Sequence, residues 1–213
     1  MFSFCQKDLR RKRNALKALV CTNKETLHYQ DEINAEAKKN ETLVKISAAG
    51  ICGSDMHAYH GQDDRHLPPL ILGHEISGIN VNNNQGVVIN PLITCNACKE
   101  CQTSHEHLYH ERSLLGMTKP INRSGGFADF VAVPNRNILT VASDLNLNSL
   151  SLTEPTAVAY HAIKIAEQSS FNNIKENKIL IIGGGAIGLL LTLILQAKNI
   201  ENITIIDTNS QRL

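Results

Sequence analysis

The chain has 213 residues, of which 42% are hydrophobic and 19% charged, so it is long enough to bury a core as one or two domains. Its formal net charge of +1 offers no overall field that would gather nucleic acid or an anionic membrane. No apolar run reaches the ~20 residues that span a bilayer, so we expect a soluble protein whose partner is a small molecule.

The N-terminal segment, residues 1–15, is basic, and the apolar stretch behind it is short and interrupted by Lys17. This pattern argues against a secretory signal and predicts a solvated extension. From residue 16 to 153, short apolar segments alternate with Gly, Pro and Asn clusters, which predicts an all-β domain. Its strands are expected at 16–21, 42–48, 86–89, 128–133 and 138–141.

The pattern changes at Glu154-Pro155, where Pro155 suits the first position of a helix. An apolar stripe supports that helix. The stripe consists of Val158, Ala162, Ile165 and Ala166.

A βαβ unit is predicted next within the third segment, 154–213. An apolar strand at 178–182 leads into the turn Gly183–Gly188, a helix at 186–198 and a second strand at 203–207. A parallel sheet of this kind normally has several more strands, so we expect an incomplete, C-terminally truncated doubly wound sheet.

The glycine turn has the spacing of a dinucleotide-binding site. Gly183 permits the tight bend, Gly185 lets the backbone approach a pyrophosphate, and Gly188 lets helix and strand pack closely. Asp207, nineteen residues after Gly188, ends the next strand and favours NAD over NADP, although Arg212 lies close by in the sequence. The alternative is a glycine-rich packing turn.

Cys52 and His74 are candidate ligands of a catalytic zinc, which binds three protein groups and keeps one position open. The third ligand is either Glu75, adjacent to His74, or Glu154, eighty residues further on, and the residues leave both open. The close spacing of Cys95, Cys98 and Cys101, and the place of Cys52 inside a glycine motif, suit thiolates on a metal better than disulfides. Reduced thiols favour a cytoplasmic location. The alternative is an ordinary buried cysteine, a core histidine and a carboxylate at a helix start.

Five motifs in order resemble the zinc-dependent medium-chain alcohol and polyol dehydrogenases, closest to the sorbitol and threonine dehydrogenase branch. They are Gly-Ile-Cys-Gly-Ser-Asp-x-His from Gly50, Gly-His-Glu-x-x-Gly from Gly73, Gly-Gly-Phe-Ala-Asp-Phe from Gly125, Glu-Pro at 154, and the glycine turn. The resemblance implies a GroES-like β-barrel domain holding zinc, followed by the first βαβ unit of a Rossmann domain holding NAD. It implies that Cys52, His74, Glu75 and Glu154 surround the catalytic zinc. It also implies that Ser54 and His57 relay the substrate proton.

One cysteine cluster departs from the family. Cys95, Cys98 and Cys101 match its structural-zinc lobe, but the fourth cysteine would fall at Tyr109. One of three histidines is an alternative fourth ligand. They are His105, His107 and His110.

Two functions therefore stand. The first is an NAD- and zinc-dependent oxidoreductase acting on the CH–OH group of a hydroxylated substrate, an alcohol or polyol. The second is a non-catalytic zinc-binding remnant or fragment of such an enzyme. The family forms homo-oligomers, but the segment that supplies its dimer surface is expected to be absent.

Overall fold

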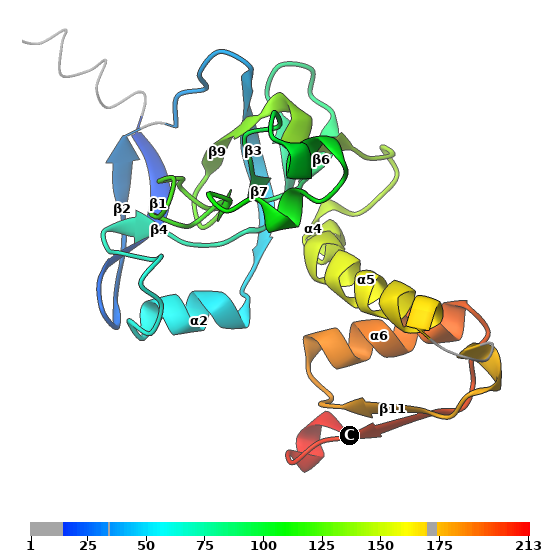
Figure 1. Ribbon diagram of the computed structural model, residues 1–213. Helices are drawn as coiled ribbons and strands as arrows, with labels where there is room; N and C mark the ends of the chain where they lie inside the picture. The colour runs from blue at the N-terminus through cyan, green and yellow to red at the C-terminus, as the bar shows by residue number, and fades with distance from the viewer. Residues whose placement is uncertain (1–14, 34, 170–173) are drawn as a thin grey trace, which may run out of the picture. The chain divides into compact units, whose positions relative to one another are not determined.

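The computed structural model describes residues 15–33, 35–169 and 174–213. The predicted basic extension therefore lies almost wholly outside the described residues. The chain divides between Ser151 and Leu152 into two compact units (Figure 1). The predicted domain boundary, between 153 and 154, stays a prediction.

The first unit is built from antiparallel sheets. Three strands pair in the order β2-β1-β4, and five pair in the order β10-β6-β5-β3-β9. The strands of these sheets are β1 (Ala15–Asn23), β2 (Thr26–Ile33), β3 (Glu41–Gly50), β4 (Leu70–Ile71), β5 (Glu75–Asn80), β6 (Gly86–Ile89), β9 (Phe130–Pro134) and β10 (Ile138–Thr140). A core of β-branched and leucine side chains, including Val44, Ile76 and Val131, fills the five-stranded sheet.

Short elements complete this unit. A small sheet pairs β7 (Leu92–Ile93) with β8 (Ser113–Leu114). The α-helices are α2 (Gly53–Tyr59), α3 (Lys99–Gln102) and α4 (Leu147–Leu150), and the 3₁₀ turns are η1 (Glu106–Leu108) and η2 (Asn135–Asn137).

The second unit contains the predicted βαβ arrangement. Its elements are α5 (Thr153–Ser169), η3 (Ile174–Glu176), β11 (Ile179–Ile182), α6 (Ala186–Ala197), β12 (Ile203–Ile206) and η4 (Ser210–Arg212). Strands β11 and β12 pair in parallel, which requires a crossover connection such as the helix α6. Ile163 of α5, Ile181 of β11 and Leu195 of α6 form its core.

The five predicted strands of the first domain and the βαβ unit are confirmed, with small shifts at the ends. Two details of α5 were wrong. The helix begins at Thr153, so Pro155 is its third residue, where a helix still needs no backbone N–H. The predicted stripe is exposed, with Val158 50% and Ile165 52% accessible, whereas the buried face carries Pro155, Ala159 and Ile163.

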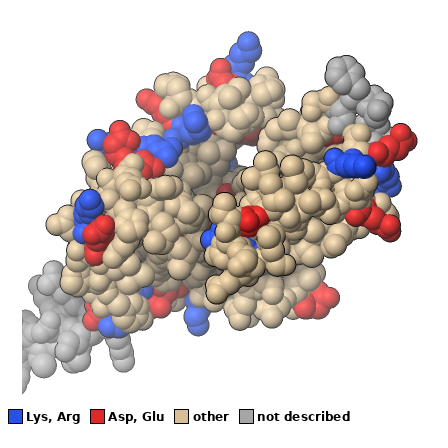
Figure 2. All heavy atoms as spheres, turned by 90° about the horizontal axis from the view of Figure 1, so that it is seen from below, with Lys and Arg blue, Asp and Glu red and all other residues tan. Residues whose placement is uncertain are grey.

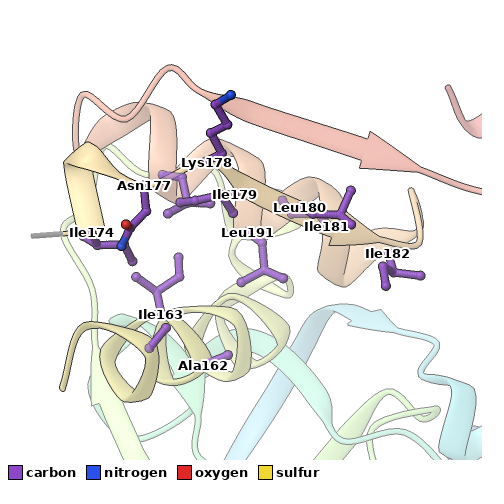
Figure 3. A pocket seen from close by; sticks show the side chains of 12 residues that line it. Ala162, Ile163, Ile174, Asn177, Lys178, Ile179, Leu180, Ile181, Ile182 and Leu191 are labelled. Atoms are coloured by element: carbon purple, nitrogen blue, oxygen red, sulfur yellow. The ribbon is translucent and has the colours of Figure 1, made fainter. Parts of the chain in front are cut away.

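A hollow of about 450 Å³ lies beside this core and is lined mainly by apolar side chains. Figure 3 shows Ile163 and Leu191 directed into it, while the Lys178 amine points away. No residue of the predicted sites lines this hollow. We therefore assign it to the packing of the unit and look for the functional site elsewhere.

None of the helices in the described part of the chain is long and apolar enough to cross a membrane. On the face drawn in Figure 2, basic and acidic side chains are interspersed among a majority of other residues. This mixture agrees with the near-zero net charge.

Candidate functional site

Cys52, His74 and Glu75 come together at one end of the five-stranded sheet, with their ligand atoms all within 4.8 Å of one another. Cys52 lies two residues after the end of β3 and is the N-cap residue of α2, while Glu75 is the first residue of β5. Because β3 and β5 are antiparallel neighbours, the end of one meets the start of the other. His74 and Glu75 are buried, and Cys52 is half-buried, so the cluster is accessible from the side of the thiol.

Gly73 makes the backbone turn that places His74 in this cluster. Gly73 adopts a φ of +94°, a conformation that other residues rarely accept. A Cβ atom there would also lie 2.6 Å from the Phe127 ring. The Gly-His-Glu motif therefore needs its glycine for both the turn and the space.

Asp55 joins the two ligand loops, and sequence reasoning missed it. Its carboxylate is 3% exposed and accepts hydrogen bonds from the backbone N–H of Cys52 at 2.9 Å and of Gly73 at 3.1 Å. One of its oxygens also lies 3.7 Å from Nδ1 of His74. Asp55 is the third residue after Cys52, which is the spacing of a capping box, and that spacing was visible in the sequence. A carboxylate beside a ligating histidine orients the ring and raises its basicity.

The charges in this cluster support one another. Burial alone would lower the pKa of His74, but hydrogen bonding to Asp55 and Cys52 raises it to about 10. The His74 ring in turn lowers the pKa of the Cys52 thiol, against the opposing effect of burial. A thiolate is the form of cysteine that binds metals. Thiolate, imidazole and carboxylate within 4.8 Å therefore make a chemically suitable donor set for zinc.

The two predicted relay residues lie on α2, one turn apart. Ser54 is half-buried, and both its hydroxyl and its backbone N–H contact the Cys52 sulfur. His57 is exposed, and its Nδ1 lies 2.9 Å from Oε1 of Gln62. The helix thus connects the edge of the metal-ligand cluster to solvent.

In the second unit, the predicted glycine turn joins β11 to α6. Gly183 has a φ of +108°, and a Cβ atom on Gly188 would lie 1.9 Å from the Gly183 carbonyl oxygen. Gly185 caps α6 without a side-chain hydrogen bond, and a Cβ atom there would meet nothing within 4 Å. The open space at the start of the helix suits a phosphate group.

Asp207 lies beside this turn. Its carboxylate accepts hydrogen bonds from the N–H of Asn209 at 2.7 Å and of Gly184 at 2.8 Å, and these contacts lower its pKa. Arg212 is 3.7 Å away and also favours the charged form. Gly183, Asp207 and Arg212 line a hollow of about 370 Å³.

Residues 38–143 match the family model of the alcohol dehydrogenase GroES-like domain. The chain is 30% identical over 209 residues to L-galactonate-5-dehydrogenase of Escherichia coli strain K12, covering 93% of this chain and 58% of that protein. The chain contains the GroES-like domain of the alcohol dehydrogenases, and its predicted resemblance to the zinc-dependent medium-chain alcohol and polyol dehydrogenase family is confirmed.

Two further members illustrate the likeness. L-threonine 3-dehydrogenase of Bacillus velezensis is 32% identical over 187 residues, covering 82% of this chain and 51% of that protein. The crystal structure of galactitol-1-phosphate dehydrogenase from Escherichia coli superposes with a TM-score of 0.79 at 28% identity, covering 92% of this chain and 57% of that one. The predicted fold, a GroES-like domain followed by part of a Rossmann domain, is confirmed. The chain thus spans somewhat more than half the length of these dehydrogenases.

Glu154, the other candidate ligand of the catalytic zinc, lies in the first turn of α5 in the second unit. Cys52, His74 and Glu75 lie in the first. The choice between Glu75 and Glu154 as the direct ligand therefore stays a prediction.

The second cysteine cluster is also assembled. The Sγ atoms of Cys95, Cys98 and Cys101 lie within 4.8 Å of one another, in the lobe between β7 and β8. Among the described residues, no histidine, aspartate or glutamate joins all three sulfurs at that distance. The histidines that were the alternative fourth ligands are thus not part of the cluster.

Proposed function

We propose that this protein transfers a hydride from the CH–OH group of an alcohol or polyol to NAD, with zinc held at the Cys52 cluster. The observation that carries the proposal is the convergence of Cys52, His74 and Glu75 within 4.8 Å, in a chain that also contains an open glycine turn. The resemblance supports it, since the named relatives are dehydrogenases.

When bound, zinc would supply Lewis acidity that makes a substrate hydroxyl easier to deprotonate, and NAD would supply the hydride acceptor. Cys52 and His74, with Glu75 or Glu154, would hold the metal. Asp55 would keep the His74 ring in place, because its two backbone hydrogen bonds tie it to both ligand loops. Cys52 is only half-buried, so the substrate hydroxyl would approach the metal position from the side of this thiol.

Ser54 and His57 would move the proton. The Ser54 hydroxyl already lies against the Cys52 sulfur, so it is within reach of a hydroxyl group bound at the metal position. His57, one turn further along α2, is exposed and would pass the proton to solvent.

Gly183, Gly185 and Gly188 would form the pyrophosphate site at the start of α6. The bare backbone at Gly185 supports this role, because a phosphate oxygen needs close approach to N–H groups. Asp207 would accept hydrogen bonds from the adenosine ribose and repel a 2′-phosphate, which favours NAD. Arg212 moderates that preference because it lies beside the same carboxylate.

The substrate is expected to carry at least one hydroxyl group, as do galactonate, threonine and galactitol phosphate, for which the relatives are named. A cytoplasmic location suits thiols that must stay reduced to bind metal.

The test combines metal analysis with turnover. Purified protein is expected to contain zinc and to reduce NAD with a sugar alcohol, sugar acid or threonine. Cys52→Ala is expected to lose zinc from this site and all turnover while keeping its circular dichroism spectrum. Turnover that survives Cys52→Ala would contradict the proposal. Zinc without measurable NAD binding would instead favour a non-catalytic remnant.

A further inference from the structure

The lobe between β7 and β8 holds three thiols in close contact. The Sγ atom of Cys101 lies 3.4 Å from that of Cys98 and 3.8 Å from that of Cys95. The Cys95 sulfur also accepts hydrogen bonds from the backbone N–H of Ala97 and Cys98, at 3.5 and 3.4 Å. Backbone donors of this kind stabilise a thiolate and fix its direction. The lobe is therefore preorganised around sulfur.

A phenol lies beside the Cys95 thiol. Tyr109 stands at the position where the family pattern expects a fourth cysteine, and it is only 9% exposed. Its hydroxyl donates a hydrogen bond to Oε2 of Glu111 at 3.0 Å, and it also contacts the Cys95 sulfur. The side chain thus occupies the place next to the thiols without adding a thiolate.

The neighbouring histidines have other partners. Nδ1 of His105 lies 3.2 Å from the Thr103 hydroxyl, and the His110 side chain is 83% exposed beside Glu111. Over the described residues, no histidine, fourth cysteine or carboxylate lies within 4.8 Å of all three sulfurs, and the Glu100 side chain contacts the Cys98 sulfur. A tetrahedral structural zinc needs four such ligands, so the three sulfurs alone do not complete its coordination.

We propose that the lobe binds one soft, monovalent ion of the copper(I) class through Cys95, Cys98 and Cys101 alone, in preference to zinc. Thiolates are the ligands that select copper(I), and a d¹⁰ monovalent ion is satisfied by three of them. Tyr109 limits the site to three thiolates because it replaces the fourth cysteine of the family pattern. The proposal does not depend on dehydrogenase activity, since the Cys52 cluster is a separate set of residues.

The test uses the full chain carrying Cys52→Ser, which removes the thiolate of the other site. Copper(I) is titrated against a copper(I) chelator, and zinc is titrated separately. We expect one copper(I) per chain with a sulfur-to-metal absorption band. Cys98→Ser should abolish both signals. If Cys98→Ser does not fold, Cys95→Ser, whose side chain is exposed, gives the same measurement.

Two substitutions at Tyr109 separate the proposed geometry from its alternatives. Tyr109→Cys restores the missing ligand and should raise zinc affinity by more than the roughly 10–100-fold typical of changes outside a ligand set. Tyr109→Phe, the matched control, should leave copper(I) binding unchanged because the phenol oxygen is not a ligand.

Three results would overturn the proposal. The first is tight zinc binding by the parent that Tyr109→Cys does not improve, which would reveal a fourth ligand. The second is a loss of metal in Tyr109→Phe, which would make the phenol a ligand. The third is no copper(I) signal that depends on Cys98.

Discussion

Gly50 and Glu75 face each other across β3 and β5, and a Cβ atom on Gly50 would lie 1.9 Å from Oε2 of Glu75. The absence of a side chain at residue 50 is what allows the glutamate to reach the Cys52 and His74 ligand atoms. A residue that carries no chemistry of its own thus shapes the metal-ligand cluster from the opposite strand.

The first prediction tests this relationship. In Gly50→Ala the new methyl group must displace the Glu75 carboxylate, so we expect zinc affinity to fall about 10–100-fold while the fold is retained. Equilibrium dialysis against a zinc chelator measures the change. Gly53→Ala, at the first position of α2, is the matched control because a Cβ atom there meets nothing within 4 Å. Equal zinc affinity in the two variants would show that Glu75 does not need its present position.

Asp55 provides the second prediction. Asp55→Asn keeps the shape of the side chain but removes the charge beside His74 and one of the two acceptor oxygens that hold Cys52 and Gly73. We expect zinc affinity to fall about 10–100-fold, as is typical for partners of ligating histidines. Asp64→Asn, at an exposed position, should leave the zinc affinity unchanged. An unchanged zinc content in Asp55→Asn at limiting zinc would remove Asp55 from the site.

Much of the fold was predictable because its signals are local. Strand β11, the glycine turn and α6 follow one another with the expected periodicity, and the turn residues have the conformations that glycine permits. Strand β2 was missed because its hairpin with β1 turns at Lys24-Glu25, without glycine, and Glu25 itself takes the positive φ. The turn signal normally read from sequence was therefore missing.

The site was predictable only as far as the ligands themselves. Cys52 and His74 can be recognised as candidate ligands from their residue types. Asp55 acts instead through hydrogen bonds from backbone N–H groups that only folding brings together. The buried face of α5 was assigned wrongly for a similar reason. Its apolar residues occur all around the helix, so tertiary packing rather than periodicity selects Ala159 and Ile163.

The third prediction concerns acid stability. Glu41 is largely buried; burial would raise its pKa, but the Lys38 N–H and the Arg123 guanidinium, at 3.0 and 2.6 Å, lower it below its ordinary value of 4.5. The unfolded chain therefore binds this proton more readily than the folded one. The contribution of Glu41 is fully present above the unfolded pKa and is lost as the pH falls through the folded pKa.

Glu41→Gln should consequently lower the free energy of unfolding by about 1–3 kcal/mol at neutral pH and flatten its decline below about pH 5. Urea unfolding at several pH values measures both effects. Glu36→Gln, at an exposed position, is the control. If the acid dependence of Glu41→Gln matches that of the parent, the ion pair with Arg123 does not contribute to it.

The last prediction separates the two roles assigned to the glycine turn. In Gly185→Ala the methyl group enters open space, so the free energy of unfolding should change by no more than about 0.5 kcal/mol. NAD binding should weaken nonetheless, because the methyl group occupies the approach to the α6 N–H groups. In Gly188→Ala the methyl group meets the Gly183 carbonyl oxygen at 1.9 Å, so unfolding should become easier by about 1–3 kcal/mol even without NAD. Thermal unfolding and NAD titration of both variants measure the difference. NAD binding unchanged in Gly185→Ala would mean that the turn serves packing alone, since only a bound phosphate can sense a methyl group that touches nothing else.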